Sequence, residues 1–222
     1  MELVDTLVLG TSAARREGSS PFIRTIIMSK QLHLIYITGL GDQNPTGQRR
    51  AIKTWRWWGV QPEFFQSNWA NDESLDQKLN RLYKLIDELA KTKNVGLVAV
   101  SAGATIAIKA FADKKDKIVG VVLIAGKINQ PDTIGNSYHR SNPSLLQAAH
   151  SGAKALKILN KRDRKRILSR YAIADERVYK SDSRIPGARN RIVPGIGHYI
   201  TIATQITVGA PSFIHFLKRL RG

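Results

Sequence analysis

The sequence contains no cysteine among its 222 residues. This absence excludes disulfides, thiolate metal sites and cysteine nucleophiles. Patterns typical of metal sites are missing too, because neither an H-x-H nor an H-E-x-x-H motif occurs and the five histidines are widely spread. We therefore expect no metal ion and no other cofactor.

Long apolar runs are also missing. The longest apolar stretch, residues 94–108, is interrupted by Ser101 and by glycines, and it is shorter than the roughly 20 residues that a membrane span needs. The N-terminus carries Glu2 and Asp5 where a secretory signal would be basic. We expect neither a membrane span nor a signal peptide, and a cytoplasmic location fits the absence of cysteine.

Acidic residues are scarce relative to basic ones. The chain has 17 Asp and Glu against 35 Lys and Arg, which gives a formal net charge of +18. Such an excess attracts polyanions such as nucleic acid or anionic lipid, although a generally basic surface would have the same composition. Because the basic residues are scattered and no nucleic-acid-binding motif is recognisable, we do not expect tight nucleic-acid binding.

Short apolar segments alternate with helical segments, which predicts an α/β fold with a mostly parallel central sheet and helices on both faces. The expected strands are 32–38, 60–67, 95–100, 118–125, 167–174 and 189–193. The expected helices are 46–58, 74–91, 105–112, a basic segment that begins at Leu145, and 211–220. Ser74 and Gln77 have the spacing of a capping box at the start of the second helix.

Two segments fall outside this alternation. Residues 1–30 form either a hairpin at the sheet edge, with segments 4–9 and 22–28 paired, or an extension that precedes a single domain at 31–222. Residues 127–166 are expected to form a short basic cap. Within 154–170, lysines and arginines accompany a single acidic residue, Asp163. Such a stretch could bind a membrane surface or nucleic acid, or recruit an anionic substrate. The alternative is a cap helix whose basic face is simply exposed to solvent.

Ser101 lies where an expected strand runs directly into a helix. A serine in that turn is strained, and the turn requires small residues two positions away on each side, which Ala99 and Gly103 supply. The turn raises the hydroxyl above the sheet and near a helix N-terminus, whose partial positive charge favours a developing anion. Ser101 is therefore a candidate nucleophile, and an ordinary N-cap is the alternative.

A serine nucleophile needs a base, usually a histidine that a carboxylate holds. His198 ends the turn-rich sequence PGIGH after the last expected strand. Sites in open α/β sheets form at the carboxyl ends of strands, so His198 is the candidate base. Three carboxylates compete to hold it: Asp175 at the end of strand 167–174, Asp132 after the preceding strand, and Asp182 in a polar loop.

These segments resemble motifs of the α/β-hydrolase superfamily, in particular small serine esterases and lipases. AVSAG at 99–103 resembles the nucleophile elbow, with Ala99 in place of the usual first glycine, and PGIGH resembles the loop that carries the histidine. The chain order Ser101, Asp175, His198 matches the family order. The resemblance covers about residues 31–222 and implies that these three residues are catalytic, with Asp132 second choice to Asp175.

The turn Thr38-Gly39-Leu40-Gly41 resembles the family's His-Gly-x-Gly loop, with threonine in place of histidine. The resemblance implies that the backbone N–H groups of Leu40 and Ala102 form an oxyanion hole. It also implies cleavage of a carboxylic ester, thioester or amide through an acyl-enzyme, with a small acyl substrate that is neutral or anionic. An acyltransferase of the same fold and a non-catalytic polyanion-binding or nucleic-acid-binding module are the alternatives.

Overall fold

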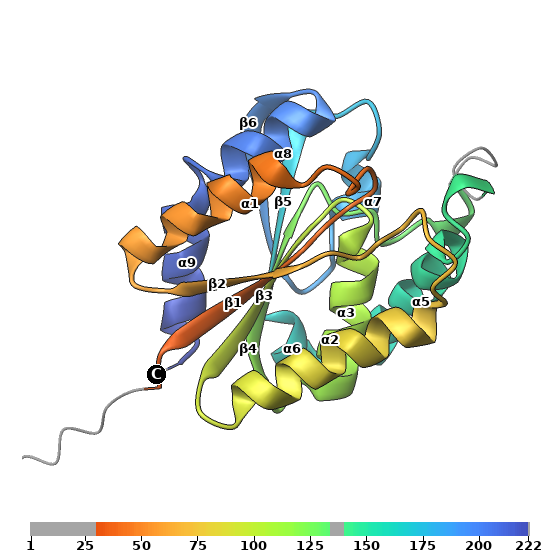
Figure 1. Cartoon of the computed structure of the whole chain (residues 1–222). Coiled ribbons are helices and arrows are strands. Elements are labelled where there is room, and N and C mark those ends of the chain that lie inside the picture. Colours follow the sequence, from red (N-terminus) through yellow and green to blue (C-terminus); the bar gives the residue numbers. More distant parts are fainter. Residues whose placement is uncertain (1–29, 134–139, 222) are drawn as a thin grey trace, which may run out of the picture.

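The computed structural model describes residues 30–133 and 140–221. The predicted pairing of segments 4–9 and 22–28 lies outside these residues. The centre of the described part is a six-stranded sheet in the order β2-β1-β3-β4-β5-β6, and every neighbouring pair is parallel. The predicted α/β architecture with a mostly parallel sheet is thereby confirmed (Figure 1).

Each expected strand is present: strand 167–174 has the expected bounds, and the bounds of the others differ by one to three residues. The strands are β1 (Leu32–Ile37), β2 (Gln61–Phe65), β3 (Asn94–Val100), β4 (Ile118–Ile124), β5 (Ile167–Ala174) and β6 (Arg189–Ile196). From β1 the chain moves outward to β2 at one edge, and it then returns to β3 on the other side of β1. This reversal of strand order opens a crevice at the carboxyl ends of β1 and β3, where ligands bind in folds of this class.

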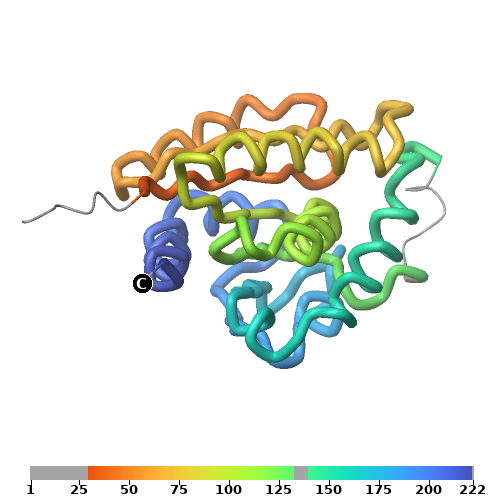
Figure 2. Tube along the Cα trace, turned by 90° about the horizontal axis from the view of Figure 1, so that it is seen from below, coloured from red at the N-terminus to blue at the C-terminus, as the bar shows by residue number. Residues whose placement is uncertain are grey.

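Helices cover both faces of the sheet. They are α1 (Thr46–Lys53), continued by the 3-10 helix η1 (Thr54–Trp58), α2 (Leu75–Ala90), α3 (Gly103–Lys114), α5 (Leu145–Ile158), α6 (Lys161–Arg164), α7 (Lys180–Ser183), α8 (His198–Ile206) and α9 (Ala210–Arg219), with the 3-10 turn η2 at Pro131–Thr133. Helices α2, α3 and α5 lie on one face, and α1, α8 and α9 on the other (Figures 1 and 2).

The alternation of side chains along the strands builds two cores. In β1, Ile35 and Ile37 pack beneath α2 and α3, whereas Leu34 and Tyr36 pack beneath α1 and α9. Successive side chains of a strand point to opposite faces, so a strand buried on both faces must be apolar throughout. This is why the central strands could be recognised as unbroken apolar runs.

The segment assigned to a basic cap, residues 127–166, contains η2, α5 and α6. Helix α5 lies along α3, and the two backbones approach so closely that a Cβ atom on Gly152 would stand 2.9 Å from the Thr105 backbone. Helix α5 therefore serves as the crossover between β4 and β5 on one face of the sheet. Of this segment, Lys127 and Leu145 alone among the described residues line the cavity discussed below.

The region after β6 differs from the prediction. The sequence placed His198 in a loop, but β6 continues to Ile196 and His198 is the first residue of α8. The sequence also does not predict a helix at 198–206, because the threonines and isoleucines of this segment have low helix propensity. Burial of Ile202 and Ile206 against the sheet stabilises the helix in spite of that propensity.

Candidate active site

The turn between β3 and α3 holds Ser101 in an unusual backbone conformation. Its φ angle is 51°, in the left-handed region that a residue with a side chain rarely adopts. The turn lies tightly against the loop after β1, because a Cβ atom on Gly39 would stand 2.8 Å from the Ser101 Cβ. Strain of this kind persists only where the surrounding structure enforces it, and it is frequent at functional sites.

Three residues that the sequence singled out meet at this turn. The Nε2 atom of His198 lies 2.9 Å from Oγ of Ser101, and its Nδ1 atom lies 2.8 Å from Oδ2 of Asp175. The side chains of His198 and Asp175 are 3% and 4% exposed, so their contact is shielded from water. The residues come from the ends of three different strands: β3, β5 and β6. This is the geometry that a nucleophile, its base and an orienting acid require.

The Asp175 carboxylate is held by more than the histidine. Burial raises its pKa, but hydrogen bonds from His198 and from the backbone N–H groups of Val178 and Arg177 outweigh that effect, and the pKa is lowered overall. The two backbone bonds to Oδ1 are each 2.9 Å long. They leave Oδ2 facing the imidazole, so the ionised carboxylate fixes the orientation of the ring.

The two competing carboxylates have other partners. Asp132 is exposed and lies 3.3 Å from His150. Asp182 is fully buried, and its Oδ2 atom accepts a hydrogen bond from Lys127 at 2.8 Å. Of the three candidates, Asp175 is the carboxylate in contact with His198.

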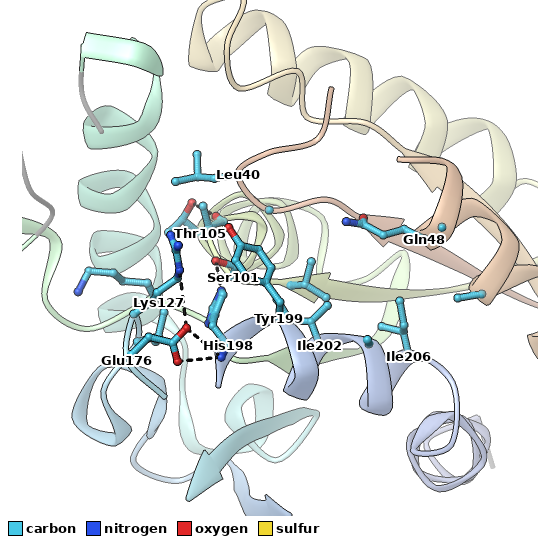
Figure 3. A pocket seen from close by; sticks show the side chains of 18 of the residues that line it. Leu40, Gln48, Ser101, Thr105, Lys127, Glu176, His198, Tyr199, Ile202 and Ile206 are labelled. Atoms are coloured by element: carbon cyan, nitrogen blue, oxygen red, sulfur yellow. Dashed lines mark hydrogen bonds and ion pairs between the residues drawn. The ribbon is translucent and has the colours of Figure 1, made fainter. Parts of the chain in front are cut away.

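A second carboxylate at the histidine was missed by the sequence analysis. Both oxygens of Glu176 accept from the backbone N–H of His198, at 3.3 and 3.0 Å (Figure 3). Gly197, the N-cap of α8, offers no side chain, so Glu176 caps this helix from the segment that follows β5. Adjacent residues at the end of β5 thus hold the ring and the backbone of one histidine. No local pattern signals this contact, because the partners are 22 residues apart.

The loop after β1 owes its shape to a buried carboxylate. Asp42 accepts hydrogen bonds from the Thr38 hydroxyl and from the backbone N–H of Asn68, both at 2.8 Å. Thr38, which stands where the resembling family has histidine, also accepts from the Ser67 N–H. Its side chain therefore anchors the loop that carries Leu40. In the described part of the chain, the N–H groups of Leu40 and Ala102 donate to no other residue.

A cavity of about 640 Å³ lies above Ser101 and His198. Helices α1 and α8 form one end, where Gln48, Ile202 and Ile206 lie, and Lys127 and Glu176 lie at the other end (Figure 3). Most of the wall is apolar. The further lining residues are Gly39, Leu40, Gly47, Ala51, Val100, Ala102, Thr105, Leu145, Arg177, Val178, Tyr179, Tyr199, Ala203 and Thr207. A cavity of this size and character accommodates a small organic molecule.

Two other kinds of feature are absent from residues 30–133 and 140–221. No group of three or more His, Asp and Glu side chains in these ranges is arranged to hold a metal ion. No single helix there is long and apolar enough to cross a membrane, and α8 and α9 reach that length and hydropathy only as a pair, across a bend of 60°.

No protein-family model matches this chain, and no curated protein sequence matches it. Solved structures do. Est1E from Butyrivibrio proteoclasticus is 14% identical with a TM-score of 0.63, over 86% of this chain and 90% of its own. Carboxyl esterase 2 from Tuber melanosporum is 16% identical with a TM-score of 0.63, over 87% of this chain and 80% of the esterase. A monoacylglycerol lipase from Paleococcus ferrophilus is 12% identical with a TM-score of 0.61, over 85% of this chain and 94% of the lipase.

These similarities extend over most of the chain and of each neighbour. They show that the chain has the α/β-hydrolase fold, as the resemblance in the sequence predicted. At 12–16% identity they establish the fold alone. What the site does must therefore be argued from its own residues.

Proposed function

We propose that this protein is a serine hydrolase that cleaves carboxylic esters through an acyl-enzyme intermediate. The observation that carries the proposal is the chain of two short contacts from Ser101 through His198 to Asp175. A serine hydroxyl becomes a useful nucleophile only when a base accepts its proton, and the contact at 2.9 Å puts a base within reach. That structural neighbours are named as esterases and lipases supports the same class of reaction.

The proposed first half-reaction forms the acyl-enzyme. Ser101 Oγ attacks the ester carbonyl carbon while His198 Nε2 accepts the hydroxyl proton, and the carbonyl oxygen becomes an oxyanion. Asp175 stabilises the imidazolium that forms and does not itself take up the proton. The Leu40 and Ala102 amides are the proposed oxyanion donors. When the intermediate collapses, the C–O bond breaks, the alcohol leaves with the proton from His198, and the acyl group stays on Ser101.

The second half-reaction repeats these steps with water. His198 accepts a proton from a water molecule, and the oxygen of this water attacks the acyl carbonyl carbon. The second tetrahedral intermediate then expels the Ser101 oxygen, which regains a proton from His198. The products are a carboxylic acid and free enzyme. The apolar end of the cavity, between α1 and α8, is the proposed place of the acyl chain, because Ile202, Ile206 and Ala51 give it no charged wall.

Steady-state hydrolysis of 4-nitrophenyl esters of short acyl chains tests this proposal. We expect turnover by the wild-type protein and its loss, by roughly 10³-fold or more, in Ser101→Ala and in His198→Ala. The free energy of unfolding, measured on the same preparations, establishes that the variants are folded. Equal turnover by the wild type and by folded Ser101→Ala would refute the proposal.

A further inference from the structure

The side-chain amide of Gln48 is a polar group at the mainly apolar end of the cavity, between α1 and α8 (Figure 3). Gln48 lies on α1, and Ala51, Ile202 and Ile206 line the same end. An amide carries one acceptor oxygen and two N–H donors, and each of these groups needs a partner where water is scarce. The partners of this amide therefore decide which ligands the apolar end accepts.

A buried tyrosine holds the oxygen atom of the amide. The Tyr36 hydroxyl donates to Oε1 of Gln48 at 3.1 Å. The Tyr36 side chain is fully buried, and the rings of Trp55 and Phe64 pack against its ring. Burial raises the pKa of Tyr36, so its hydroxyl keeps the proton and remains a donor. The Gln48 oxygen is thus directed toward the core of the protein.

The opposite orientation of the amide would leave a buried donor without an acceptor. A glutamine amide can present either its oxygen or its nitrogen to a neighbouring hydroxyl. In the described part of the chain, Gln48 is the one hydrogen-bond partner of the Tyr36 hydroxyl. If Nε2 of Gln48 faced the tyrosine, the buried O–H group would have no acceptor, which is strongly disfavoured. Oε1 therefore faces Tyr36, and Nε2 faces away from it.

The amide nitrogen remains for a ligand. Within residues 30–133 and 140–221, Nε2 of Gln48 donates to no other group of the protein. The side chain is half-buried and lines the same cavity as Ser101. Figure 3 shows it extending from α1 toward the interior of this cavity, with the amide at its tip. An oriented pair of N–H groups is therefore open to a molecule that occupies the cavity.

We propose that Gln48 selects esters whose acyl chain carries an uncharged acceptor oxygen, such as an ether or keto oxygen, away from the scissile bond. Nε2 of Gln48 donates to this oxygen while the rest of the acyl chain contacts Ile202 and Ile206. A hydrogen bond is stronger in apolar surroundings, and a purely hydrocarbon chain would leave the amide nitrogen without a partner. This inference rests on the proposed ester hydrolysis and adds the substrate class.

Esters in which one methylene group is replaced by oxygen provide the test. 4-Nitrophenyl hexanoate is compared with the 3-ethoxypropanoate and 4-methoxybutanoate esters, and 4-nitrophenyl heptanoate with the 5-methoxypentanoate ester. Each ether ester has the same reactive group and chain length as its alkyl counterpart, and its oxygen stands four, five or six atoms along the chain, counted from the carbonyl carbon. The measured quantity is the ratio of kcat/KM for each ether ester to that for its alkyl ester.

Gln48→Leu should lower this ratio by about three- to tenfold, the range expected for one neutral hydrogen bond, and the fall should be largest for one position of the oxygen. The intrinsic reactivity and the hydration of each ester are the same with both proteins, so they cancel when wild type and variant are compared. Gln48→Glu keeps an acceptor for Tyr36 but, when ionised, has no N–H group. It should lower the same ratio at least as much.

Two further variants separate an oriented contact from general effects. Tyr36→Phe keeps the amide and removes the group that orients it, so its ratio should lie between those of the wild type and Gln48→Leu. Gln147→Leu makes the same substitution at an exposed position of α5 outside the cavity, and its ratio should equal that of the wild type. Urea unfolding of the same preparations establishes that the variants are folded.

The outcomes distinguish this inference from the proposed function. Ser101-dependent hydrolysis with the same ratios in wild type and Gln48→Leu would overturn the role of Gln48 and leave the hydrolase intact. If Gln48→Leu does not fold, unchanged ratios in Gln48→Glu lead to the same conclusion. An equal fall for all three ether esters, or a fall in Gln147→Leu, would also overturn it, because neither result requires a specific contact. Absence of any Ser101-dependent hydrolysis would refute the proposed function and the inference together.

Discussion

A Cβ atom on Gly103 would stand 2.5 Å from the carbonyl oxygen of Thr38. The first turn of α3 and the end of β1 are therefore in direct backbone contact, and this contact sets Ser101 beside the loop that carries Leu40. A side chain at position 103 would push the two segments apart. The glycine is required here by the close approach of two backbones, because its own φ angle is ordinary.

Gly103→Ala is accordingly expected to lower the free energy of unfolding by about 1–3 kcal/mol, as overpacking in a rigid core does. The loss of kcat/KM for an ester should exceed what the loss of stability explains, because the proposed oxyanion donors move. Gly47→Ala is the matched control for stability: apart from its chain neighbours and the backbone of its own helix, a Cβ atom there would meet no atom within 4 Å, and alanine favours helix α1. Denaturant unfolding measures both variants, and a neutral Gly103→Ala would contradict the packing argument.

The lowered pKa of Asp175 predicts a pH-dependent contribution to stability. A carboxyl whose pKa is lower in the folded state stabilises the fold above its ordinary pKa of 3.8, and this contribution is lost as the pH falls through the folded value. Asp175→Asn removes the ionisable group. The difference in free energy of unfolding between wild type and Asp175→Asn should therefore be larger near pH 6 than near pH 3. Urea unfolding at a series of pH values measures it, and a difference independent of pH would contradict the lowered pKa of Asp175.

Glu176 is expected to act as a positioning residue for His198. Glu176→Ala leaves the His198 N–H without its acceptor, so it should lower the free energy of unfolding by about 0.5–2 kcal/mol, the usual loss for a removed helix cap. It should also lower kcat more than it changes KM. Glu176→Gln keeps an acceptor oxygen and should restore most of kcat. Unfolding and steady-state kinetics on the three proteins decide the point, and equal kcat in wild type and Glu176→Ala would argue against this role.

The parts that the sequence predicted well are those that have a local signature. Strands β3 and β4 are buried on both faces and therefore read as short apolar runs. The capping box of α2 was expected from two residues, and both of its hydrogen bonds, between Ser74 and Gln77, are present. The elbow and the segment PGIGH identified Ser101 and His198, which the fold brings to hydrogen-bonding distance across 97 positions of the chain.

The parts that the sequence could not predict depend on distant contacts. Helix α8 is stabilised by Ile202 and Ile206 against the sheet, contrary to its local propensity. Thr38, Asp42 and Asn68 shape the loop after β1 through side-chain bonds that no spacing rule reveals. The family resemblance ranked Asp175 before Asp132 as the partner of His198, but the contact itself joins residues that follow two neighbouring strands, β5 and β6, and their pairing could not be derived from the spacing of the residues.

Labelling with a fluorophosphonate tests the central claim most directly, because such a probe reacts with a serine only when a neighbouring base activates the hydroxyl. The intact mass of the wild-type protein should increase by the mass of one probe molecule less HF, because the serine oxygen displaces fluoride from phosphorus, and peptide mapping should place the label on Ser101. His198→Ala should label far more slowly, and Ser101→Ala should not label. An unlabelled wild type, or a label retained by folded Ser101→Ala, would contradict the account.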